Sequence, residues 1–157
     1  KPWRWDPGHM ASGISLLNNN LTAKKIDKKG LNKGVLGNIE MKEGVYRWRI
    51  KTKLGHPSSI MVLGITCKEN MGDLENFVVQ VNKQYGIFSS GTLGNYGHKI
   101  DFENKVFEFE LNFEKGTFSI VHEDDIVYYV PSGILGNTFI PFARMNTLGD
   151  EVTLLWP

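Results

Sequence analysis

Few residues in this chain have the types and spacing that catalysis or metal binding requires. Its four histidines are scattered along the sequence, and Cys67 is the single cysteine that could act with them as a metal ligand. Zinc sites need several closely spaced histidine or cysteine ligands, so we predict no metal site and no cofactor. Residues 64–67 read as the end of a core strand, where a free cysteine usually packs as a small hydrophobe. A hydrolase that uses Cys67 would need a thiol that reacts quickly in the folded protein.

Two further clusters resemble functional motifs without completing them. Glu123, Asp124 and Asp125 lack the spacing along a loop, ending in a bidentate glutamate, that a calcium-binding EF-hand requires. We expect a solvated hairpin turn there. The glycine-rich run 91–97 lacks the Lys-Ser/Thr pair of a nucleotide-binding loop, so we predict a surface loop that carries Tyr96. Because no Gly-x-Ser-x-Gly sequence offers a nucleophile either, we predict that the chain is not an enzyme.

The elements that would position any site are short β-strands. Between Tyr46 and Lys51, aromatic or aliphatic residues alternate with basic ones. This period of two is typical of a half-buried strand. Residues 106–111 repeat this alternation, and after a turn at 112–116 the chain returns at 117–121, which predicts a hairpin. A turn of helix is expected only at 70–76. Further strands are predicted at 13–17, 22–26, 34–39, 59–66, 77–81, 85–89, 126–130, 139–145 and 151–155.

The tripeptide Leu-Gly-Asn occurs between these strands at 36–38, 93–95 and 135–137. Glycine and asparagine reach positive φ angles most easily, so each copy predicts a place where the chain reverses or bulges. Many short strands with regular turns indicate an all-β sandwich or barrel.

Composition limits the choice of partners. The 157 residues suit one compact domain, and 18 basic against 17 acidic residues leave a net charge of +1. Such a balance favours neither nucleic acid nor a membrane surface, and no apolar run is long enough to span a bilayer. Five lysines fall within residues 24–33, but no aromatic residue is interleaved to stack on bases, so a solvated loop is expected. The unpaired cysteine fits a reducing, cytoplasmic environment.

The amino-terminal residues allow two interpretations. Residues 8–12 resemble a remnant of an expression vector, which would make residues 1–12 a separate and partly foreign segment before a domain at 13–157. The amphipathic continuity from Trp5 into Ile14 favours a natural segment instead.

The order of the segments resembles a SPRY domain. Trp5-Asp6-Pro7 followed by residues 14–23 is similar to the opening strands of that family. Residues 44–50 resemble its Gly-x-x-Tyr-Trp-Glu-Val strand, with Arg47 and Arg49 in place of the aromatic and the acid. Similar matches follow at 62–65, 85–87, 111–119, 140–143 and 152–154. The resemblance implies a single bent antiparallel β-sandwich of the concanavalin-like jelly-roll type, without catalysis.

The same resemblance implies binding of a protein or short peptide through loops at one end of the sandwich, as in substrate recognition for a ubiquitin ligase or in a signalling assembly. Carried onto this chain, that surface comprises the loops 25–33, 70–76 and 147–149, with Leu74 and Leu148 where larger aromatics would be stronger anchors. The alternative is a carbohydrate-binding sandwich that uses Asn95, Tyr96 and His98. The candidate partner-binding residues are Lys25, Lys28, Lys29, Leu74, Tyr96, Thr147, Leu148 and Gly149.

Overall fold

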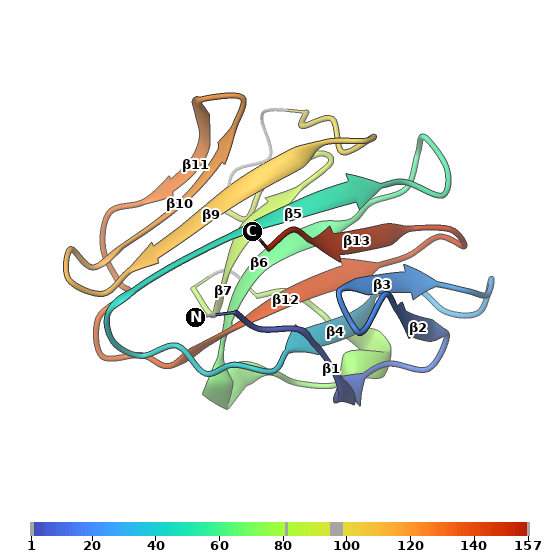
Figure 1. Ribbon diagram of the computed structural model, residues 1–157, viewed down its shortest axis with the longest axis horizontal. Coiled ribbons are helices and arrows are strands. Elements are labelled where there is room, and N and C mark those ends of the chain that lie inside the picture. Colours follow the sequence, from blue (N-terminus) through green and yellow to red (C-terminus); the bar gives the residue numbers. More distant parts are fainter. Residues whose placement is uncertain (1, 81, 95–98, 157) are drawn as a thin grey trace.

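The chain folds into two antiparallel sheets packed face to face (Figure 1). The computed structural model describes residues 2–80, 82–94 and 99–156. One sheet has the strand order β1 (Trp5–Met10), β4 (Lys33–Gly37), β12 (Phe139–Met145), β6 (Val62–Cys67), β7 (Gln84–Phe88) and β8 (Gly91–Thr92). The other has the order β11 (Asp125–Val130), β10 (Thr117–His122), β9 (Val106–Asn112), β5 (Val45–Lys53), β13 (Glu151–Leu154), β3 (Thr22–Lys25) and β2 (Ile14–Leu17). The expected all-β sandwich is confirmed.

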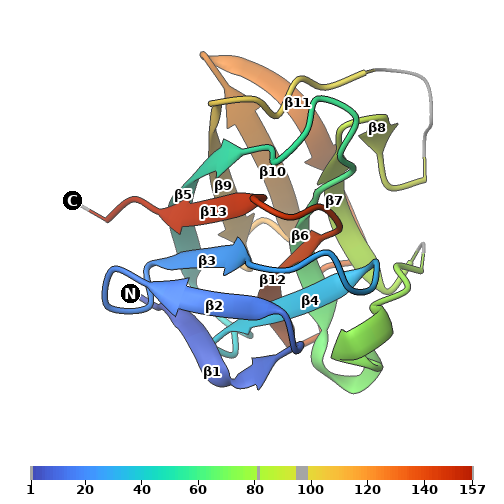
Figure 2. The same ribbon diagram turned by 90° about the vertical axis from the view of Figure 1, so that its right-hand side faces the viewer.

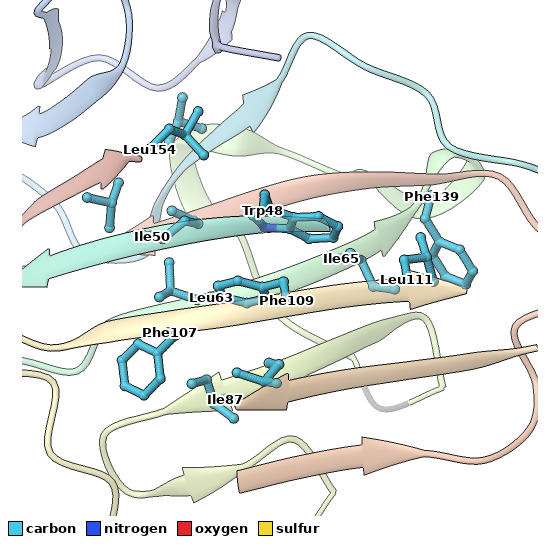
Figure 3. Packing of buried hydrophobic residues seen from close by; sticks show 14 of the residues in the cluster. Trp48, Ile50, Leu63, Ile65, Ile87, Phe107, Phe109, Leu111, Phe139 and Leu154 are labelled. Atoms are coloured by element: carbon cyan, nitrogen blue, oxygen red, sulfur yellow. The ribbon is translucent and has the colours of Figure 1, made fainter. Parts of the chain in front are cut away.

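Between the two sheets lies the main core, and the predicted strand at 45–51 shows how it forms. Trp48 and Ile50 point inward and are buried, while Arg47 and Arg49 are exposed, as the alternation predicts. The ring of Trp48 stacks on Phe109 of β9, with centroids 5.2 Å apart. Figure 3 shows buried side chains from both sheets gathered in this layer. The predicted hairpin is also present, as β9 paired with β10.

A cluster of tryptophans joins the amino-terminal segment to this core. Trp3 and Trp5 are buried, with ring centroids 5.1 Å apart, and β1 pairs with β4. The ring of Trp3 also lies against Trp48 and Trp156, and the indole N–H of Trp156 donates to the carbonyl of Trp3 at 2.8 Å. Trp3, Trp5 and Ala11 therefore belong to the main core of the sandwich.

A second, smaller core covers the outer face of the six-stranded sheet. The short 3-10 helices η1 (Lys68–Asn70) and η2 (Leu74–Asn76) cross this face, in agreement with the helical turn expected at 70–76. Phe77 follows η2 and packs edge-on against Phe142, with centroids 5.1 Å apart. The strand predicted at 77–81 is wrong for residues 77–80, because this segment covers the sheet and does not extend it. Val81 lies outside the described residues.

The Leu-Gly-Asn tripeptides have two different roles. Gly94 and Gly136 have φ angles of +89° and +84°, so both glycines lie in turns as predicted; Asn95 lies outside the described residues. The first copy does not form a turn, because Leu36 and Gly37 lie inside β4. A Cβ atom on Gly37 would meet the ring of Trp3 at 2.6 Å, so this position needs a glycine for packing.

The acidic cluster forms the turn that was expected. Glu123 and Asp124 join β10 to β11 with φ angles of 49° and 68°, and both are exposed. Successive positive φ angles suit the right-handed twist of a tight hairpin.

Candidate binding surface at one end of the sandwich

Four connections meet at one end of the sandwich, on the right in Figure 1 and facing the viewer in Figure 2. We call this surface the loop rim. It comprises the β3–β4 loop (26–32), the β5–β6 loop (54–61), η2 with the residues on either side of it (73–78), and the β12–β13 loop (146–150).

Backbone hydrogen bonds join three of these connections. The N–H of Gly149 donates to the carbonyl of Lys25 at 2.9 Å, and the N–H of Phe77 donates to the carbonyl of Asn32 at 2.7 Å. The N–H of Asn32 donates in turn to the side-chain oxygen of Asn146 at 2.6 Å. The rim is therefore one connected surface built from segments far apart in the sequence.

A buried carboxylate fastens the β5–β6 loop to the β12–β13 loop. Asp150 is fully buried, and its oxygens accept hydrogen bonds from the N–H of Gly55 at 2.8 Å and the hydroxyl of Ser59 at 2.7 Å. The same carboxylate accepts from the N–H groups of Asn146 and Thr147. Four donors compensate the burial of its charge, because a carboxylate is costly to bury unless it is well hydrogen-bonded.

The two loops also touch directly. A Cβ atom on Gly55 would lie 1.9 Å from the carbonyl oxygen of Leu148, a distance that no side chain can occupy. Gly149 completes the contact with a φ angle of +94°, which favours glycine. These two glycines allow the loop backbones to approach so closely.

One candidate residue, Lys25, is not on the surface at all. It is fully buried, and its ammonium group donates to the carboxylate and carbonyl of Asp27 at 2.6 and 2.8 Å and to the carbonyl of Lys29 at 2.9 Å. The β3–β4 loop folds over the end of this side chain. The expectation that Lys25 contacts a partner is therefore corrected: Lys25 holds the shape of the loop from inside.

The position of η2 is set by a carboxylate that three groups share. Glu75 accepts from the ammonium of Lys33 at 2.7 Å and from the hydroxyl and N–H of Ser12, both at 2.6 Å. These bonds lower the pKa of Glu75 from 4.5 to about 2, because they stabilise its ionised form, with Lys33 the largest cause. The loop rim is thus tied to the segment that follows β1.

The remaining candidates differ in exposure. Lys28 and Lys29 are exposed, and no hydrogen bond or ion pair within the described residues holds either ammonium group. Leu148 is 40% exposed. Leu74 is partly buried and packs over Gly34, so its side chain contributes to the second core of the domain. Tyr96 lies outside the described residues, as do Asn95 and His98. Thr147 and Gly149 are partly exposed beside Leu148.

The sequence analysis missed the aliphatic part of the rim. Four large apolar side chains are exposed on its loops: Ile26 (54%), Leu31 (66%), Val78 (58%) and Ile60 (37%). Leu31 had a visible signal, because it is an apolar residue between the turn formers Gly30 and Asn32, both with positive φ. Ile26, Ile60 and Val78 fall within the predicted strands 22–26, 59–66 and 77–81, so the sequence pattern does not indicate that they are exposed.

Chemistry elsewhere in the described chain is sparse. Burial raises the pKa of the Cys67 thiol above its ordinary value, whereas a nucleophilic cysteine needs a lowered pKa. Within residues 2–80, 82–94 and 99–156, no group of three His, Cys, Asp or Glu side chains could hold a metal ion. The same residues include no helix long and apolar enough to cross a membrane.

Solved structures with this arrangement of strands define the class of fold. The crystal structure of the TRIM65 PSpry domain matches with a TM-score of 0.75 at 11% identity, over 100% of this chain and 90% of that one. The crystal structure of the SPRY domain of human HERC1 matches with a TM-score of 0.69 at 12% identity, over 96% of both chains. The chain therefore has the SPRY fold, and the resemblance seen in the sequence is confirmed at the level of fold.

A third structure, stonustoxin, matches with a TM-score of 0.71 at 13% identity. It covers 99% of this chain, which spans 27% of the stonustoxin chain. By sequence, no family model and no curated protein matches.

Proposed function

We propose that this domain is a protein-interaction module whose loop rim binds a partner segment with aliphatic and acidic side chains. The observation that carries the proposal is the presence of the exposed Leu31, Ile26 and Leu148 on the same surface as the exposed Lys28 and Lys29. Exposed apolar residues grouped on one surface are typical of interaction sites. The exposed ammonium groups of these two lysines favour carboxylates in the partner.

Hydrogen bonds that hold the connections of the rim together also support the proposal. Asp150 joins the β5–β6 and β12–β13 loops, and Lys25 and Glu75 hold the β3–β4 loop and η2, each through several hydrogen bonds. Preorganisation lowers the entropy lost on binding and so favours affinity. The SPRY fold and the resemblance of the motifs support a non-catalytic role as a recognition module, with substrate selection for a ubiquitin ligase or a signalling assembly in the cytoplasm as the wider setting.

A random peptide library displayed on phage tests this proposal. We expect the selected peptides to combine aspartate or glutamate with leucine, isoleucine or valine. Their affinity should fall about tenfold or more when Leu31→Asp or Lys28→Glu is introduced, because each change places a negative charge against an acidic or apolar segment. Leu135→Asp is the matched control, since Leu135 is 61% exposed on the β11–β12 loop, outside the rim. Equal affinity for all three variants and the wild type would reject the rim as the binding site.

A further inference from the structure

The outer face of the seven-stranded sheet is open, unlike that of the six-stranded sheet. In Figure 1 this face is turned toward the viewer, and no other described element lies over β5, β9 and β10. The side chains of β5 that point outward on this face are basic: Arg47, Arg49, Lys51 and Lys53. The face lies beside the loop rim and not within it.

The strand register arranges this face in two rows of matching chemistry. Across β11, β10, β9 and β5, the first row is Tyr129, Ser119, Glu110 and Arg47, and the second is Ile126, Val121, Glu108 and Arg49. Leu155 continues the second row, because its N–H donates to the carbonyl of Arg49 at 3.0 Å. The second row therefore passes from apolar through acidic to basic and back to apolar, whereas the first row has the polar Ser119 before its acidic and basic residues.

The two rows differ in whether their charged side chains form an ion pair. Arg47 and Glu110 form an ion pair at 2.8 Å. Arg49 and Glu108 lie opposite each other, yet within the described residues neither side chain has an ion pair. A groove of about 470 Å³ lies on this face, and the residues that line it include Val121, Leu155 and Trp156. The face thus combines two available charges of opposite sign with an apolar margin.

Such a pattern is complementary to itself. A two-fold axis parallel to the strands, between β5 and β9, would place Glu108 of one copy over Arg49 of the other, and Arg49 over Glu108. The same rotation brings Val121 over Leu155. Isologous interfaces require this kind of self-complementarity, because each patch must meet an identical patch.

We propose that this face is the interface of a symmetric homodimer, formed by packing the seven-stranded sheets of two copies against each other. Two Arg49–Glu108 pairs cross the interface, with apolar contacts at its margins. The loop rim lies at the end of the sandwich (Figure 2), so dimerisation leaves it accessible and presents two rims to a partner. This proposal does not depend on peptide binding at the rim.

Sedimentation equilibrium over a wide range of protein concentrations tests the interface. The wild type should dimerise reversibly, and more weakly at high salt because the crossing charges are screened. Arg49→Glu alone and Glu108→Arg alone should each raise the dimer dissociation constant by about tenfold or more, since like charges then face each other. Lys42→Glu, an exposed charge reversal in the β4–β5 loop, should leave it unchanged.

Mixing the two single variants gives the decisive result. In the mixed pair, both glutamates of the Arg49→Glu chain face both arginines of the Glu108→Arg chain. A heterodimer should therefore form from two monomeric variants, which a simple folding defect cannot produce. A wild type that stays monomeric, single variants that dimerise like the wild type, or a mixture that stays monomeric would each overturn the proposal.

Discussion

The ammonium nitrogen of Lys25 lies 2.6 Å from Oδ1 of Asp27, and the side chain of Lys25 is fully buried. Lys25 is the last residue of β3 and Asp27 lies two positions later, so the β3–β4 loop closes over the ammonium group of the strand that precedes it. The ammonium group holds the backbone of the loop at Asp27 and Lys29, on either side of the exposed Lys28.

Removing the buried ammonium should destabilise the domain. We expect Lys25→Ala to lower the free energy of unfolding by about 2–3 kcal/mol, because three hydrogen bonds to a charged donor are lost and their acceptors are left within the loop. Urea denaturation followed by circular dichroism measures the change. Lys28→Ala, on the exposed side of the same loop, should stay within about 0.5 kcal/mol of the wild type. Equal stabilities for the two variants would contradict a structural role for Lys25.

The contact between Gly55 and Leu148 predicts a second sensitive position. Gly55→Ala should cost about 1–3 kcal/mol, because the new methyl group forces the two loop backbones apart. It should also weaken peptide binding at the rim, since Leu148 moves with its loop. Gly8→Ala is a suitable comparison, because a Cβ there meets only the Asp6 side chain at 3.2 Å. Thermal unfolding and peptide titration report the two effects separately, and an unaffected Gly55→Ala protein would argue against the close contact.

The bonds to Glu75 predict how stability depends on pH. The pKa of this carboxyl is lowered in the folded protein to about 2 from an ordinary 4.5. A lowered folded pKa contributes stability above the unfolded pKa, and this contribution is lost as the pH falls from about 4.5 toward 2. Glu75→Gln should therefore reduce the melting temperature at neutral pH and flatten its decline in this acid range. Parallel pH profiles for the variant and the wild type would contradict the ionic role of Glu75.

The raised pKa of Cys67 predicts low reactivity. Burial keeps the thiol protonated at neutral pH, and thiolate is the form that reacts with alkylating agents. Iodoacetamide should modify native Cys67 at least about tenfold more slowly than the urea-unfolded chain, which mass spectrometry can follow. Rapid modification of the native protein would instead favour the cysteine hydrolase considered in the sequence analysis.

The strands were predictable wherever a residue's type matches the side of the sheet that it faces. Trp48 and Arg49 are an example, since one is apolar and inward and the other charged and outward. Phe77 was not, because an apolar residue that covers the outside of a sheet has the same local pattern as one within a strand. Gly37 looked like a turn residue, but the ring of Trp3 explains it, and that contact is distant in sequence.

The candidate site was predictable only in its location. Three of the four connections that form the rim were identified, and Lys28, Lys29 and Leu148 lie exposed on them. A lysine in a polar stretch is expected to be solvated, so the burial of Lys25 could not be predicted. Only the folded loop brings three acceptors to its ammonium group. Asp150 was overlooked for a similar reason, since its four donors come from two different loops.

Backbone amide chemical-shift mapping with a library-selected peptide tests recognition by the loop rim most directly. The account predicts that the largest changes fall on residues 26–32, 54–61 and 146–149, and that Leu31→Asp abolishes them while Leu135→Asp does not. Changes centred on the outer face of β5, β9 and β10, or on the β11–β12 loop, with the rim unaffected, would contradict it.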